Sequence, residues 1–350
     1  MQKTLGYRIK NVLLALLVFV AMIVLPVFTS GVVLGVIEGF ARATGGSRAV
    51  ADAYLFLIDN LNLFSAGVYV LFGIPVLIWV VVQRRRGRRA ERARAAQAAH
   101  VTQVAATGLP AQVPAASIPA AFPAQAPGAP GLAGYYEQQP VVPPSVNRGN
   151  ALAGLPEQIS FRVRGVARSA WFDAAFLGIG MQFVTTFIMI LVMVLLPAAM
   201  EEYQELVGDS GLLDYGIMWF ISTIVLPPLV EETGFRGLGL TYLKRAGVPF
   251  VVANVLQALA FGLFHGNLVQ GIYTFVLGLF MGYVVHRSGS VVPAMLMHAV
   301  YNLMGTLGSD VLYTLVPWLP FWVELAVGAV LSLGAMISLH DRGGRPAASS

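Results

Sequence analysis

The sequence predicts an all-α membrane protein, a polytopic helix bundle of about eight transmembrane helices. Hydrophobic residues occupy 57% of the 350 positions and charged residues only 11%, whereas about a quarter of the residues of a soluble domain are charged. Apolar runs close to the ~20 residues of a membrane-spanning helix recur along the chain. These observations exclude a soluble globular protein and a disordered one. The absence of cysteine excludes disulfides, a thiol nucleophile and a thiolate metal site.

The apolar runs give the order of the helices. The eight predicted spans are Val12–Ile37, Phe64–Val82, Ala174–Ala199, Tyr215–Val230 with a continuation, Val248–Leu263, Leu268–Val285, Val291–Leu307 and Pro317–Leu339. Short flanking segments rich in Lys and Arg mark the cytoplasmic side of a membrane. They precede the first span, follow the second and recur near Arg245, Arg287 and Arg342. We therefore expect a multi-pass protein of a bacterial cell membrane with both termini in the cytoplasm.

The basic residues also bear on partners. Seven arginines lie between positions 84 and 94, directly after the second span. A basic run beside a membrane helix is typical of contact with anionic lipid. We predict membrane lipid as a partner, and no nucleic acid. The sequence leaves the oligomeric state open.

A change in composition divides the chain. Residues 95–160 are rich in proline and alanine and nearly uncharged, which predicts a disordered cytoplasmic linker. It separates an N-terminal unit of two helices, residues 1–94, from a unit of six helices, residues 161–350, with a motif core at 214–308. No internal repeat is visible, which disfavours a transporter built from inverted repeats.

Ionisable residues inside apolar helices indicate a functional site, because they are costly in a bilayer. Glu231 and Glu232 follow the apolar run 221–230 without a polar break, and Arg236 comes four residues after Glu232. Residues four apart share a helix face, so Glu232 and Arg236 form a charge-neutral pair. Glu231 points elsewhere and remains the free carboxylate, suited to act as a general base. An ordinary ion pair at a helix end is the alternative.

Two further motifs place polar groups in apolar helices. Phe261 lies four residues before His265, and His298 lies four residues before Asn302. Imidazole and carboxamide groups can donate hydrogen bonds to an oxyanion. The alternatives are a structural histidine in the core and a hydrogen bond between helices.

In this order, EExxxR, FxxxH and HxxxN resemble the CPBP family of intramembrane CAAX proteases and bacteriocin-processing enzymes, also called the ABI family. The similarity runs from about Asp214 to Gly308. It implies an intramembrane endopeptidase that acts on membrane-associated, CAAX-like or leader-peptide substrates. It also implies roles: Glu231 and His265 activate water, His298 and Asn302 stabilise the oxyanion, and Glu232, Arg236 and Phe261 support the site.

The resemblance leaves the metal open. Glu231, His265 and His298 would be adequate ligands for an open zinc site, although the chain has no HExxH motif. We favour a glutamate-type enzyme without a cofactor over a metalloprotease. A proton-coupled transporter would spread its polar residues along a pathway, and an inactive immunity or scaffold protein would have a broken motif. Neither pattern is seen.

Overall fold

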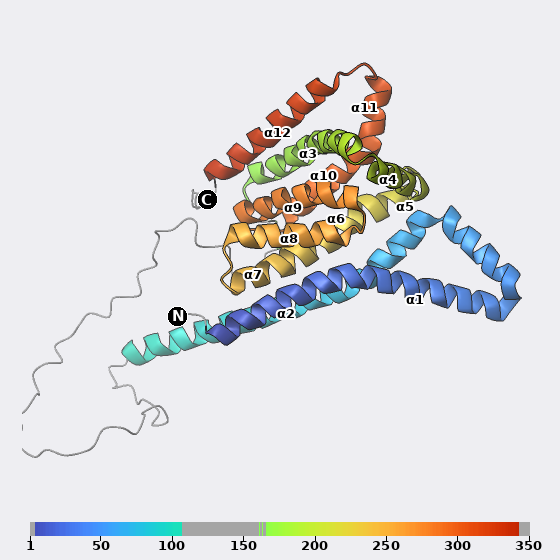
Figure 1. Cartoon of the computed structure of the whole chain (residues 1–350). Coiled ribbons are helices and arrows are strands. Elements are labelled where there is room, and N and C mark those ends of the chain that lie inside the picture. Colours follow the sequence, from blue (N-terminus) through green and yellow to red (C-terminus); the bar gives the residue numbers. More distant parts are fainter. Residues whose placement is uncertain (1–3, 107–160, 162, 164–165, 343–350) are drawn as a thin grey trace, which may run out of the picture. The chain divides into compact units, whose positions relative to one another are not determined.

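The computed structural model describes residues 4–106, 161, 163 and 166–342, and all regular structure in this part of the chain is helical (Figure 1). Five of the helices described are long and apolar enough to cross a membrane: α1 (Leu5–Asp59), α2 (Leu61–Ala106), α3 (Arg168–Leu195), α9 (Leu268–Ser288) and α12 (Phe321–Arg342). The prediction of an all-α membrane bundle is confirmed. The chain forms two compact units, residues 1–84 with 154–350 and residues 85–153.

The first helix is longer than the run that predicted it. Helix α1 contains the predicted span and continues to Asp59, but it bends at Gly46. There the backbone has φ +68°, a left-handed conformation that glycine adopts without steric cost. At its start, the side chain of Thr4 accepts a hydrogen bond from the backbone N–H of Tyr7 at 3.3 Å, which caps the helix.

Helix α2 also extends beyond its apolar run. It continues through residues 95–106, where the sequence predicted the start of the linker. Alanine and arginine dominate residues 84–106, and both are strong helix formers. The next proline is Pro110. The rest of the predicted linker, residues 107–160, lies outside the described residues.

The fourth predicted span is a helical path of five short elements. These are α5 (Ile217–Trp219), η2 (Phe220–Val225), α6 (Leu226–Glu232), η3 (Thr233–Leu240) and α7 (Thr241–Arg245), of which η2 and η3 are π-helical. Pro227 and Pro228 carry no N–H, so the regular i→i−4 hydrogen bonds are interrupted at the start of α6. π-helical turns inside helices occur frequently at functional sites.

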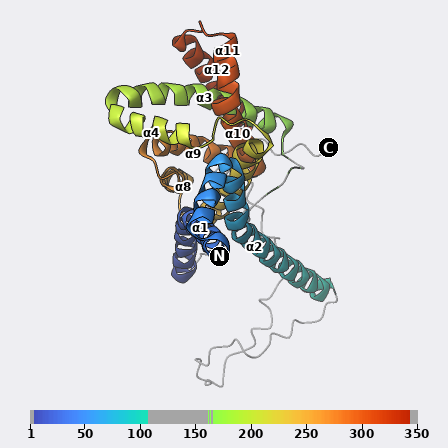
Figure 2. The same ribbon diagram turned by 90° about the vertical axis from the view of Figure 1, so that its right-hand side faces the viewer.

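The remaining helices complete the bundle. They are α4 (Pro197–Asp209), α8 (Phe250–Phe264), α10 (Val292–Leu303), η4 (Met304–Gly308) and α11 (Ser309–Leu315). Every predicted span therefore contains helix, although α8 is short, two of the spans are broken by π turns, and some predicted bounds are wrong. The third span, residues 174–199, crosses Leu196, where α3 ends because the residue before a proline disfavours the α conformation. The last span was predicted from residue 317, whereas α12 begins at Phe321. Both views place α3 and α12 on one side of α8, α9 and α10, and α1 on the other (Figures 1 and 2).

A single apolar core joins α1, α2, α3, α6 to α10 and α12. Helix α2 contributes Val68, Phe72, Val76 and Val80, all buried and spaced four residues apart, so one face of α2 packs inward. Helix α1 packs on η3 at two glycines. A Cβ at Gly234 would overlap the sulfur of Met22, and one at Gly239 would overlap the ring of Phe19. The N-terminal helices thus share the core that surrounds the predicted motifs.

Candidate active site

The two adjacent glutamates lie at the end of α6 and are both buried, Glu231 with 2% and Glu232 with 0% of its surface exposed. The Oε1 atom of Glu232 accepts a hydrogen bond from Nη1 of Arg236 at 2.9 Å. It accepts a second from Nδ1 of His298 at 3.0 Å. The pair Glu232–Arg236, four residues apart, is therefore present as an ion pair, and it also contacts α10.

Glu231 has different partners, because adjacent helix residues point ~100° apart. Its Oε1 atom accepts a hydrogen bond from the hydroxyl of Tyr69 in α2 at 2.5 Å. Its Oε2 atom is buried, and no donor in the described part of the chain makes a hydrogen bond with it. This oxygen lies 3.9 Å from Nε2 of His298. One carboxylate oxygen of Glu231 is thus held, and the other faces the second motif histidine.

The hydrogen bonds of the two histidines define their tautomers. A carboxylate and a carbonyl oxygen only accept, so Nδ1 of His298 donates to Glu232. In the same way Nδ1 of His265 donates to the backbone oxygen of Phe261 at 2.9 Å. In the neutral imidazole, Nε2 is then an acceptor. Each ring is oriented by its Nδ1 contact, which leaves Nε2 for chemistry.

Phe261 lies between the charged and the imidazole groups. Its buried ring has the guanidinium carbon of Arg236 4.2 Å from its centroid, a cation–π distance. The ring of Phe261 also makes T-shaped contacts with both imidazole rings. The distance between ring centroids is 4.9 Å to His265 and 5.9 Å to His298. Phe261 therefore packs against Arg236 and both histidines.

Asn302 occupies the same helix as His298 but points its amide at another element. Its Nδ2 atom donates to the backbone oxygen of Thr223 at 2.9 Å, in the π-helical η2. A carboxamide has two N–H donors, so this contact leaves one. The sequence paired Asn302 with His298 as oxyanion donors; the structure shows that half of this donor capacity orients the side chain.

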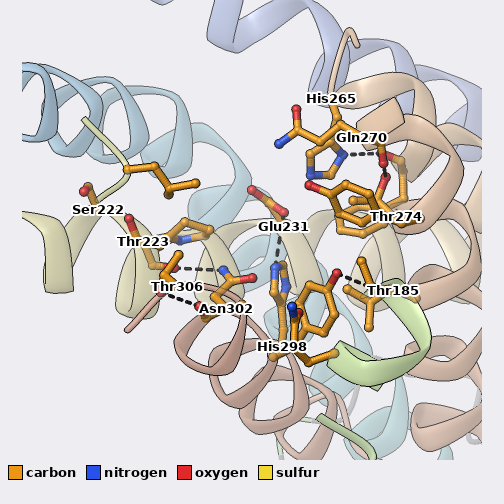
Figure 3. Close-up of a pocket in the computed structure, with 18 of the residues that line it drawn as sticks. Thr185, Ser222, Thr223, Glu231, His265, Gln270, Thr274, His298, Asn302 and Thr306 are labelled. Atoms are coloured by element: carbon orange, nitrogen blue, oxygen red, sulfur yellow. Dashed lines mark hydrogen bonds and ion pairs between the residues drawn. The ribbon is translucent and has the colours of Figure 1, made fainter. Parts of the chain in front are cut away.

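The four predicted catalytic residues line one cavity of about 360 Å³. In Figure 3, Glu231 lies between His265 and His298, with Asn302 on the side of Thr223. Most of the other lining residues are polar, and they come from α10 and from six further elements, α2, α3, α4, η2, α9 and η4. They include Ser65, Tyr69, Gln182, Thr185, Tyr203, Ser222, Gln270, Tyr273, Thr274, Tyr301 and Thr306. The structure thus brings all four residues together in a largely polar chamber inside an apolar bundle.

Sequence reasoning missed Tyr69. A weak signal existed, because Asn62, Ser65 and Tyr69 recur at helical spacing near the start of an otherwise apolar run. In the structure Ser65 and Tyr69 line the cavity. Asn62 accepts a hydrogen bond from Ser222 at 3.1 Å. The polar face of α2 therefore belongs to the site.

The residues that would have held zinc do not form a metal site. Within the described ranges, no group of three or more His, Cys, Asp or Glu side chains could hold a metal ion. Glu231, His265 and His298 share the cavity but are not such a group. No step of the chemistry below is therefore assigned to a metal.

Fold and site together define a polytopic membrane protein with a buried cavity equipped for acid–base chemistry. Residues 214–304 match the family model described as "Type II CAAX prenyl endopeptidase Rce1-like". This segment is therefore similar to Rce1-like endopeptidases, which confirms the resemblance to the CPBP and CAAX proteases. It supports intramembrane endopeptidase activity in general, in an integral membrane protein. No curated protein and no solved structure matches the chain.

Proposed function

We propose that the protein hydrolyses peptide bonds inside the membrane with a water molecule activated by Glu231 and His265. His298 and Asn302 stabilise the oxyanion, and Glu232, Arg236 and Phe261 hold the site. The substrates are membrane-associated proteins of the CAAX-like or leader-peptide type. The unit formed by residues 161–350 carries the chemistry. Both termini and the predicted linker, residues 95–160, lie in the cytoplasm of a bacterial cell.

One observation carries this proposal: Oε2 of Glu231 is buried in the cavity without a hydrogen-bond donor among the described residues. A buried acceptor without a partner is costly, so its retention needs a reason. A water molecule would satisfy Oε2 with one proton. Nε2 of His265, whose ring also lines the cavity, would take the other hydrogen bond and orient the water oxygen toward the substrate.

The proposed reaction balances without a cofactor. The water oxygen bonds to the carbonyl carbon of the scissile peptide while one of its protons passes to Oε2 of Glu231. The electron pair of the carbonyl double bond moves to the oxygen, which becomes an oxyanion. When the carbonyl re-forms, the C–N bond breaks and the leaving nitrogen takes the proton from Glu231. Water is consumed, and an acid and an amine are formed.

Stabilisation of the oxyanion requires hydrogen-bond donors that line the same cavity. Asn302 retains one N–H after its bond to Thr223. His298 becomes a donor at Nε2 when its ring carries a second proton, because Nδ1 already donates to Glu232. Oε1 of Glu232 accepts the hydrogen bonds of both His298 and Arg236, which fixes the orientation of the His298 ring. Fixed donors in a cavity shielded from water stabilise developing charge strongly.

The first test replaces Glu231 with Gln, which keeps the shape and removes the base. We expect purified Glu231→Gln in proteoliposomes to lose all measurable cleavage of an internally quenched peptide. The peptide ends in farnesylated cysteine followed by three residues. Glu324→Gln is the matched control, because Glu324 is also buried, with 4% exposed, and bonds to Tyr313 away from the cavity.

Two further arms define the mechanism and the substrate. Wild-type activity that a chelator removes and zinc restores contradicts the metal-free mechanism. Cleavage of the farnesylated peptide, and not of its unprenylated counterpart, supports the CAAX-like substrate class. If the Glu231→Gln variant cleaves the peptide at the wild-type rate, the assignment of Glu231 as the catalytic base is wrong.

A further inference from the structure

We infer that Tyr69 in α2 is a positioning residue for Glu231, so the site is completed by a helix outside the matched segment. The inference rests on the proposed function. Tyr69 lies 162 positions from Glu231 in the sequence, yet its hydroxyl donates to Oε1 at 2.5 Å. Tyr69 also lines the cavity, so its hydroxyl reaches Glu231 from within the proposed site.

The backbone of α2 is held close to this point by a glycine. Gly73 lies four residues after Tyr69 and therefore on the same helix face. A Cβ at Gly73 would lie 2.8 Å from a methyl group of Val230, the residue before Glu231. Since real Cβ contacts are not that short, a larger residue would push α2 away from α6. Tyr69 and Gly73 thus form one docking face for Val230 and Glu231.

The packing around Tyr69 restricts where its hydroxyl can lie. Its ring contacts the ring of Phe72 with a centroid distance of 5.1 Å, and Phe72 is 1% exposed. Phe72 belongs to the buried stripe of α2 that enters the common core. Because the ring of Tyr69 is packed against Phe72, its side chain has few rotamers. Its hydroxyl donor is therefore oriented before any substrate binds.

The consequence for chemistry follows from the two oxygens of the carboxylate. The last torsion of a glutamate side chain is broad, so the plane of a carboxylate without contacts can rotate. The bond from Tyr69 occupies Oε1 and leaves Oε2 directed at Nε2 of His298, 3.9 Å away. Tyr69 therefore fixes the plane of the carboxylate, so that one oxygen is held and the other faces the cavity to receive the proton from water.

A purely structural role is the competing explanation, because one hydroxyl bond between helices can simply stabilise the bundle. The chain offers a matched control for it. Trp79, also in α2, donates through Nε1 to the hydroxyl of Tyr242 at 3.0 Å. Neither residue lines the cavity. Tyr242→Phe and Tyr69→Phe therefore each remove one hydroxyl bond between α2 and the rest of the bundle, one outside the site and one inside it.

The experiment compares the full-length variants in proteoliposomes with the quenched farnesylated peptide, and follows their thermal unfolding. We expect Tyr69→Phe to lower kcat about 10-fold to 100-fold, the loss of one hydrogen bond to a charged group. KM should stay at the wild-type value, and Tyr242→Phe should keep the wild-type kcat. A fall in kcat confined to Tyr69→Phe, with melting temperatures equal for the two variants, supports positioning.

The other outcomes distinguish failure of the positioning role of Tyr69 from failure of the proposed function. Wild-type kcat in Tyr69→Phe, or an equal loss in both variants, overturns the positioning role. If Glu231→Gln is inactive in the same assay, the proposed function survives that result. If Glu231→Gln cleaves at the wild-type rate, the proposed function fails instead, and the positioning role fails with it.

Discussion

The matched segment 214–304 and the helices α1 and α2 contribute to the same core in different ways. The segment supplies every ionisable group of the buried cluster, from Glu231 to His298. The N-terminal helices supply apolar packing and close contacts at glycines, and Tyr69 alone reaches a carboxylate of the cluster. The chemistry is thus concentrated in one segment, while part of its rigidity comes from helices that share none of its motifs.

This division predicts two kinds of variant. Changes to the polar cluster of the segment should act on its charge balance or on kcat, whereas changes to the packing of α1 and α2, including their contacts with η3, should act on stability, with Tyr69 as the exception. A variant that crosses this line would break the comparison.

The largest effect is expected for Arg236→Met. Arg236 and Glu232 are paired with side chains that are 0% exposed, so the variant leaves a buried carboxylate without its main counter-charge. Removing one partner of a buried ion pair costs about 3–5 kcal/mol. We expect a melting temperature far below the wild-type value and no cleavage. Arg42→Met is the control, because its pair with Glu38 in α1 is exposed. Equal melting temperatures of both variants would contradict the proposal that Arg236 holds the site through its pair with Glu232.

Local spacing accounts for what could be predicted at this site. The pair Glu232–Arg236 lies within one helical turn, so periodicity places both side chains on one face. No local sequence pattern predicts the contact between Tyr69 and Glu231, because the two residues lie in different helices and 162 positions apart. The bond from Asn302 to Thr223 depends on a backbone oxygen in a π-helical turn. Residue types do not encode that geometry.

The helices follow the same rule. Apolar length predicted the existence and order of the spans, because burial in lipid requires it. It did not detect the π-helical breaks between Ile217 and Arg245, which depend on prolines, glycines and packing. Nor did apolar length predict the charged end of α2, where helix propensity rather than hydrophobicity continues the helix.

Asn302→Ala should give the next largest effect. Loss of one oxyanion donor lowers kcat about 10²-fold to 10³-fold, and steady-state kinetics on the quenched peptide measures it. The control is Asn62→Ala in α2. Asn62 also donates its amide to a backbone oxygen, that of Gly211 at 2.9 Å, but it does not line the cavity. We expect Asn62→Ala to lower the melting temperature and to keep kcat. An unchanged kcat in Asn302→Ala together with a lower kcat in Asn62→Ala would show that Asn302 is not an oxyanion donor.

The smallest effect tests the packing of α1. Gly239→Ala places a methyl group against the ring of Phe19, and overpacking a core costs about 1–3 kcal/mol. Gly35→Ala is the control, because nothing lies within 4 Å of a Cβ at Gly35. We expect only Gly239→Ala to lower the melting temperature, with kcat unchanged in both variants. A smaller side chain at position 19 should relieve the clash. Phe19→Leu combined with Gly239→Ala should therefore recover part of the lost stability. Strict additivity of the two changes would show that α1 does not pack on η3 at this glycine.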